Sequence, residues 1–272
     1  KRGLGNSGRL YGHVKATKPE TGLEVGFRYS LNSGAVDADG RLTNGTSMTA
    51  SYDSENTDVF TSTIQTIKVA TYYYQAYTLY EGVYHYGEVK SFGAKDVDLG
   101  LPSGVKWVDM NLGADNEEAY GDTYRWGETE PGQTGTYSVP QERTYIGGTT
   151  FDAAHTRLGT DYRLPSNDNI QELIDQCSWQ WEATGFRVTS KKNGNSIFLP
   201  VGSGCSYWSS LEGVTAGSAA SLEMDPSNRH VAEALRSSGL YLRPTRNPNL
   251  DMESEGGNAG VGTIGGGIQG NE

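Results

Sequence analysis

Residues 196–210 read SIFLPVGSGCSYWSS, and the fold of the second half of the chain turns on this stretch. It begins as an apolar strand, and Pro200 breaks that strand because proline has no backbone N–H for a β-ladder. Glycines follow, and the strand pattern resumes at Tyr207. The stretch therefore predicts two strands joined by a glycine loop. Its serines, cysteine and tryptophan raise the question of whether it forms an active site or frames a binding surface.

A helix and a hairpin precede this stretch. Residues 163–177 carry apolar side chains at a spacing of three to four, and Ser166 stands where an N-cap is expected. The buried stripe of this helix is predicted to be Ile170, Leu173, Ile174 and Cys177. Residues 186–190 and 195–199 are predicted strands, joined by the turn sequence KKNG. The region therefore combines antiparallel strands with one good helix.

The first third of the chain has short strands and turns without a helix signal. The clearest pair is TYYYQAYTL at 71–79 and VYHYGEVKSF at 83–92, with Glu81 and Gly82 in the turn. Regular strands with hairpin turns indicate a β-sandwich. A period of two places Tyr72 and Tyr74 on one face and Tyr73, Gln75 and Tyr77 on the other.

These tyrosines have two interpretations. We expect them to fill the sandwich core and cover its sheet, because tyrosine suits half-buried sheet surfaces. The alternative is a platform on which sugar rings stack.

Two resemblances to known families rest on ordered motifs. Those of the second region are VDLGLPSGVKW (97–107), NLGA (111–114), YGDTYRWGET (120–129), YRLPS (162–166), GFRVTS (185–190), NGNSIFLP (193–200), YWSS (207–210) and GLYLRP (239–244). In this order they resemble the Fibrobacter succinogenes major paralogous domain, which has a C-type-lectin-like fold. The first region, through TYYYQAY (71–77) and YGEVKSF (86–92), resembles fibronectin type III-like modules.

The sequence thus predicts an all-β sandwich of fibronectin III or Ig-like type, followed by an α+β C-type-lectin-like domain. The expected parts are a flexible lead-in (1–7), the sandwich (8–94), the C-type-lectin-like domain (95–245) and a Gly-rich tail (246–272). The tail has almost no bulky residue and cannot bury a core by itself. The resemblance implies an extracellular protein, on a bacterial cell surface of Bacteroides-like type or on a phage particle.

The same resemblance bears on the opening question. It implies that Trp208 fills the core, and that Ser209 and Ser210 satisfy backbone groups rather than act as nucleophiles. A serine nucleophile needs an adjacent base, and of the four histidines only His230 falls in a loop region near the 207–210 strand. The formylglycine-generating enzymes share the fold but depend on paired cysteines, a pattern that Cys177 and Cys205 do not reproduce. We therefore expect no catalytic residue and no enzyme.

Binding is the remaining interpretation. The resemblance places the ligand surface in 211–218 and 225–236, and polar loops on a rigid scaffold are common recognition sites. The candidate ligand contacts are Glu212, Thr215, Ser218, Asp225, Asn228, Arg229, His230, Glu233 and Arg236. The expected function is an adhesin or receptor-binding module that grips a glycan or protein receptor. The alternative is a structural subunit of a fibre, pilus or phage particle, with the tail joining copies into a homo-oligomer. Some proteins of this fold are diversified targets of retroelements, so that role stays open.

Composition limits the partners and cofactors. A net charge of −11 and a pI near 4.9 disfavour nucleic acid. No apolar run approaches the roughly 20 residues that span a bilayer, and the start at Lys1 rather than Met suggests a processed product. Acidic residues crowd 115–130, but charge runs usually form solvated loops and the calcium-lectin tripeptides are absent. We expect no cofactor and no metal site, with calcium as the alternative.

The two cysteines leave two alternatives. A Cys177–Cys205 disulfide would form in an oxidising compartment. Two separate buried thiols are the other interpretation, and the sequence does not choose between them.

Overall fold

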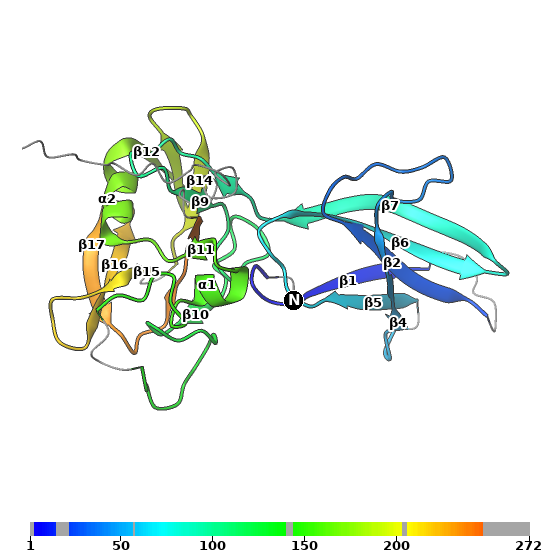
Figure 1. The fold of residues 1–272 in the computed structure, drawn as a ribbon, viewed down its shortest axis with the longest axis horizontal. Helices are drawn as coiled ribbons and strands as arrows, with labels where there is room; N and C mark the ends of the chain where they lie inside the picture. Colours follow the sequence, from blue (N-terminus) through cyan, green and yellow to red (C-terminus); the bar gives the residue numbers. More distant parts are fainter. Residues whose placement is uncertain (1–2, 15–21, 57, 140–143, 203–205, 247–272) are drawn as a thin grey trace, which may run out of the picture.

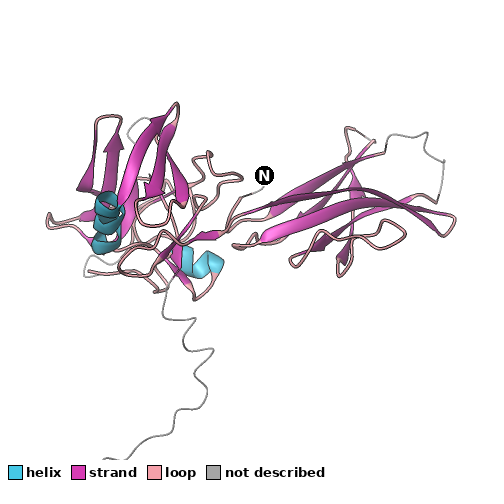
Figure 2. Ribbon diagram, turned by 90° about the horizontal axis from the view of Figure 1, so that it is seen from above, coloured by secondary structure: helices cyan, strands magenta, loops and turns pink. Residues whose placement is uncertain are grey.

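The computed structural model describes residues 3–14, 22–56, 58–139, 144–202 and 206–246. These residues form mostly β-sheet, arranged in several sheets, with two short helices (Figure 2). They build two units that lie end to end: strands β1 to β7 make one unit, and β8 to β19 with α1 and α2 make the other (Figure 1). The expectation of a β-rich chain is confirmed at this level. Neither helix in the described residues is long and apolar enough to cross a membrane.

The first unit is built from two antiparallel sheets on a common core. Its strands are β1 (Gly8–His13), β2 (Glu24–Ser30), β3 (Thr46–Thr49), β4 (Ser51–Tyr52), β5 (Val59–Ile64), β6 (Thr71–Tyr80) and β7 (Val83–Gly93). One sheet has the order β1-β5-β4 and the other β3-β2-β6-β7. The buried core between them is Leu10, Val25, Phe27, Phe60, Ile64, Ile67, Tyr72 and Tyr74.

The alternation along β6 divides the tyrosines between two environments. Tyr72 and Tyr74 are buried in the core, where the Tyr72 ring stacks on Phe92 with a centroid distance of 5.2 Å. Tyr77 lies among the residues that line the outer face, and its cross-strand partner is Tyr86. The expectation that tyrosines fill the core is therefore right for Tyr72 and Tyr74, and Tyr77 and Tyr86 cover the outer face of the sheet, as its second part states.

The second unit has more, shorter elements. They are β8 (Asp96–Val97), β9 (Lys106–Val108), β10 (Thr123–Tyr124), α1 (Ala153–Leu158), β11 (Tyr162–Arg163), α2 (Asn167–Gln176), β12 (Cys177–Glu182), β13 (Gly185–Ser190), β14 (Ser196–Pro200), β15 (Ser206–Glu212), β16 (Ser218–Asp225), β17 (Asn228–Leu235), β18 (Leu240–Tyr241) and β19 (Thr245–Arg246). The sheet orders are β10-β18-β15-β16-β17, β11-β19-β9-β8 and β12-β13-β14. Strand β17 is thus the edge of the largest sheet of this unit.

Helix α2 forms where its capping signal predicts. The Ser166 hydroxyl accepts a hydrogen bond from the backbone N–H of Asn169, and the Asn169 side chain accepts one from the Ser166 N–H. This capping box satisfies two N–H groups that the first turn would leave unpaired. Ile170 and Leu173 are buried beneath the helix. Cys177, predicted as the last residue of the buried stripe, is instead the first residue of β12, where it is still buried.

Residues 196–200 and 206–210 belong to two strands of this unit. Strand β14 ends at Pro200 and β15 begins at Ser206, while residues 203–205 fall outside the described part. Trp208 is fully buried, and its indole N–H donates to the Tyr124 carbonyl at 2.8 Å. Arg243 is also buried and donates to the Phe198 carbonyl at 2.7 Å and to the Asn111 side chain at 2.8 Å. These bonds tie segments far apart in the sequence to β14 and β15.

The N-terminal segment is not a flexible lead-in. Leu4 is fully buried in a core of the second unit. Its backbone N–H donates to the Ala114 carbonyl at 2.8 Å, and its carbonyl accepts from the Gly113 N–H at 2.7 Å. The Asn6 side chain donates to Asp122 at 2.7 Å and accepts from Arg157 at 2.7 Å. The expectation for residues 1–7 is therefore wrong from residue 3 onward, because one apolar side chain in a Gly-rich segment finds a pocket in the other unit.

Candidate ligand-binding site

The nine candidate contacts lie along one hairpin and the strand beside it. Strands β16 and β17 pair from Ser218 with Leu235 to Asp225 with Asn228. Seven residue steps at about 3.4 Å each put the two ends roughly 24 Å apart. One group, Glu212, Thr215, Ser218, Glu233 and Arg236, lies toward the 213–217 loop; the other, Asp225, Asn228, Arg229 and His230, lies at the turn end. The hairpin therefore separates the predicted residues into two places.

Glu233 holds the loop between β15 and β16. Its carboxylate accepts hydrogen bonds from the N–H groups of Val214 and Thr215 and from the Ser218 hydroxyl. These donors, the Val214 N–H first, lower the pKa of Glu233 to about 2 because they stabilise the charged form. Glu233 is thus a loop anchor in this structure, and Ser218 is buried beneath the loop.

Arg236 is a support for the same loop. Its side chain is buried, its Nε donates to the Ser218 carbonyl at 2.8 Å, and one terminal nitrogen lies 3.0 Å from Glu212. The guanidinium also lies 4.5 Å from the centre of the Trp126 ring. The prediction of direct ligand contact is therefore wrong for Arg236 and Ser218, because both are enclosed by the protein's own groups.

The turn end presents an exposed polar cluster. Asp225 accepts hydrogen bonds from the N–H groups of Ser227 and Asn228 at 2.7 and 2.8 Å, which fixes the turn. The Asn228 amide nitrogen lies 3.3 Å from Nδ1 of His230. His230 faces its cross-strand partner Glu223, with 4.0 Å between Nε2 and Oε2, and both side chains are more than half exposed. We call Glu223, Asp225, Asn228 and His230 the turn patch.

Arg229 lies apart from the turn patch. Its guanidinium carbon is 5.3 Å from the centre of the Trp179 ring on β12. Its Nε is buried and has no hydrogen-bond partner among the described residues. Alternation along β17 explains the separation, since Asn228 and His230 project to the face opposite Arg229. Arg229 therefore packs against the neighbouring sheet.

The prediction that Ser209 and Ser210 satisfy backbone groups holds for Ser209 only, because the buried Ser210 hydroxyl has no hydrogen-bond partner among the described residues. The Ser209 hydroxyl donates to the Asn167 side chain at 2.6 Å and accepts from the Leu211 N–H at 3.3 Å. Ser209 and Ser210 are both fully buried. His230, in contrast, is exposed and faces Glu223. The described residues therefore do not join these groups into a nucleophile and base pair.

The acidic residues of 115–130 are distributed among separate basic or amide partners. Glu128 pairs with Arg125 at 2.6 Å, Glu130 with Arg157 at 2.7 Å, and Glu117 with Arg187 at 3.2 Å. Within the described ranges no three His, Cys, Asp or Glu side chains come together as a metal site. Each of these three carboxylates is therefore paired with an arginine guanidinium.

Of the two cysteines, Cys177 is a free thiol in this structure. It is buried, and burial raises the pKa of its thiol to about 11 because the thiolate loses solvation. Cys205 lies outside the described residues. The structure therefore supports the separate-thiol alternative for Cys177.

The chain has no counterpart among the known proteins with which it was compared. No family model, no curated protein and no solved structure matches it.

Proposed function

We propose that this protein is a non-enzymatic, extracellular binding protein, an adhesin or receptor-binding module. In this proposal a fibronectin III-like sandwich carries a C-type-lectin-like unit, and the unit grips a glycan or protein receptor on a cell surface. The observation that carries the proposal is the turn patch, a compact group of exposed polar side chains on a hydrogen-bonded turn at the edge of a sheet.

The turn patch stands on a buried strand face. Leu222 and Met224, the β16 neighbours of Glu223 and Asp225, are buried. Asp225 holds the turn through two backbone N–H groups. A site already ordered before binding loses less conformational freedom when a ligand arrives. The patch is thus suited to recognition by a fixed arrangement of groups.

The patch mixes donors and acceptors. Carboxylates accept hydrogen bonds, the Asn228 amide does both, and His230 changes role with its tautomer. Such a mixture matches the hydroxyls of a glycan or the polar groups of a protein surface, and it binds without turnover. The proposed family is supported by the motif residues Trp107, Trp126 and Trp208, which are fully buried in the second unit as structural positions of a shared fold would be.

The test is ligand binding by the whole chain and by Asn228→Ala/His230→Ala. The isolated 95–245 segment is unsuitable because Leu4 completes its core, and Arg236 is left intact because it is buried. The matched control is Asn32→Ala/His13→Ala, which changes the same residue types at exposed positions of the first unit. Binding to at least one immobilised glycan or cell-surface protein should be lost in the turn-patch variant and kept in the control. A turn-patch variant that keeps every ligand of the whole chain would refute the proposed site.

A further inference from the structure

A groove crosses the outer face of the four-stranded sheet in the first unit. Its volume is about 560 Å³, within the range of roughly 300–1,000 Å³ typical of small-molecule sites. The residues that line it and carry the argument are Arg28, Asp39, Arg41, Tyr77, Tyr84 and Tyr86. They come from three strands of the sheet and from the loop between β2 and β3.

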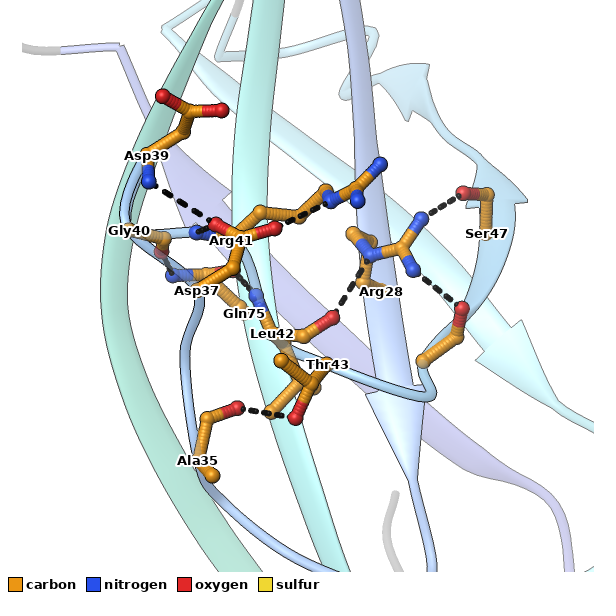
Figure 3. A network of polar contacts seen from close by, with 11 residues as sticks. Arg28, Ala35, Asp37, Asp39, Gly40, Arg41, Leu42, Thr43, Ser47 and Gln75 are labelled. Carbon is orange, nitrogen blue, oxygen red and sulfur yellow. Dashed lines mark hydrogen bonds and ion pairs between the residues drawn. The ribbon is translucent and has the colours of Figure 1, made fainter.

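That loop makes one wall of the groove, and Gln75 pins it to the sheet (Figure 3). The Gln75 amide nitrogen donates to the carbonyls of Gly40 and Gly87 at 2.7 and 2.8 Å. Its amide oxygen accepts from the Leu42 N–H at 2.7 Å, and Leu42 is fully buried. Gln75 thus makes three hydrogen bonds to backbone groups, two of them in the loop and one on β7, and these bonds fix the loop in one position. The wall is therefore preformed.

The two arginines differ in how many guanidinium N–H groups they can offer to a ligand. Arg28 is held by the Leu42 and Gly45 carbonyls and by the Ser47 hydroxyl, and it forms part of the frame. The Nε of Arg41 donates a hydrogen bond to the Asp37 carboxylate at 2.9 Å. Its two terminal nitrogens have no partner among the described residues, and its side chain is 52% exposed (Figure 3). Arg41 therefore offers four N–H donors to a ligand.

Three tyrosines form the opposite side. The Tyr84 and Tyr86 rings are parallel to within 1°, with centroids 5.7 Å apart, and the Tyr77 ring is 5.6 Å from Tyr84 at 63°. A side chain at Gly26 would collide with the Tyr77 ring, so this glycine admits the ring against the sheet. Tyr84 is 51% exposed, which leaves ring surface available to a ligand.

The charges select the class of ligand. Arg41 is paired with Asp37, Asp39 also lines the groove, and Arg28 is held by two backbone carbonyls and a hydroxyl. The groove therefore carries charges of both signs rather than forming a purely cationic site for an anion. Exposed aromatic rings pack on the apolar C–H faces of sugar rings, while guanidinium donors and carboxylate acceptors match neighbouring hydroxyls. We infer that this groove binds a neutral oligosaccharide. The inference does not depend on the turn patch, which lies in the other unit.

The experiment titrates the whole chain by calorimetry with neutral hexasaccharides derived from cellulose, mannan and starch, and with an oligogalacturonate as an acidic comparison. The groove variant is Tyr84→Ala/Tyr86→Ala, and the matched control is Tyr11→Ala, an exposed tyrosine on β1 (49% against 51% for Tyr84). At least one neutral sugar should bind, and its affinity should fall about tenfold or more in the groove variant and stay unchanged in the control. Arg41→Gln, which alters only an exposed loop side chain, should weaken the same sugar.

Three results would overturn the inference. They are the absence of binding by every neutral sugar, binding of the acidic oligosaccharide alone, and binding that Tyr84→Ala/Tyr86→Ala and Arg41→Gln leave unchanged. Asn228→Ala/His230→Ala, measured in parallel, should retain the sugar, so failure of the turn patch and failure of the groove give different patterns.

Discussion

Leu4→Ala should destabilise the second unit although residue 4 precedes the first unit in the sequence. The change removes three carbon atoms from a fully buried side chain. At about 0.8 kcal/mol per buried carbon the transfer contribution is roughly 2.4 kcal/mol, and the cavity left behind brings the loss to about 3 kcal/mol. The backbone bonds of Leu4 to Ala114 and Gly113 do not involve its side chain and should persist.

The assay is urea unfolding followed by tryptophan fluorescence. All five tryptophans lie in the second unit, at positions 107, 126, 179, 181 and 208, so the signal reports that unit alone. The control Leu235→Ala makes the same chemical change in the second unit at a residue that is 63% exposed, and it should shift the free energy of unfolding by less than about 0.5 kcal/mol. A tryptophan transition that is unchanged in Leu4→Ala would refute the docking of the N-terminal segment.

Two further predictions concern the loop anchor and the helix cap. The pKa of Glu233 is lowered from 4.5 to about 2, so its hold on the 213–217 loop should be complete above pH 4.5 and lost as the pH falls through about 2. The amide NMR chemical shifts of Val214 and Thr215 should change with pH as Glu233 titrates, and this change should be absent in Glu233→Gln. A titration midpoint near pH 4.5 would contradict the role of Glu233 as a loop anchor. Ser166→Ala should cost about 1 kcal/mol of stability by removing the α2 cap. Ser178→Ala, at an exposed serine, is its control in thermal unfolding, and equal effects of the two changes would count against the capping box.

The sequence predicted elements whose signals are local. Helix α2 has its capping residue and its 3–4 apolar spacing within one short segment, and the β6–β7 hairpin has alternation and a turn side by side. Strand β12 was missed because it follows α2 without a break, and the spacing of Cys177 fits a helix as well as it fits a buried strand position. Local patterns do not mark such a junction.

The site depends on contacts between distant residues, and here the sequence was a weaker guide. Arg236 sits in a polar segment that resembles a binding loop, but Glu212 and Trp126 enclose it. The alternation along β6 assigned its tyrosines to two faces of the sheet, but it did not show which face the loop between β2 and β3 would cover. The groove needed Gln75 to pin that loop, a long-range contact with no sequence pattern of its own.

The most direct test of binding without turnover uses one glycan and receptor array. The whole chain, the turn-patch variant and the groove variant are probed side by side, and each captured ligand is recovered and weighed by mass spectrometry. The account predicts saturable binding by the whole chain, loss of at least one ligand in the turn-patch variant, weaker binding of the neutral sugar in the groove variant, and recovered ligands of unchanged mass. Ligand converted to a product, or the absence of saturable binding by the whole chain, would contradict it.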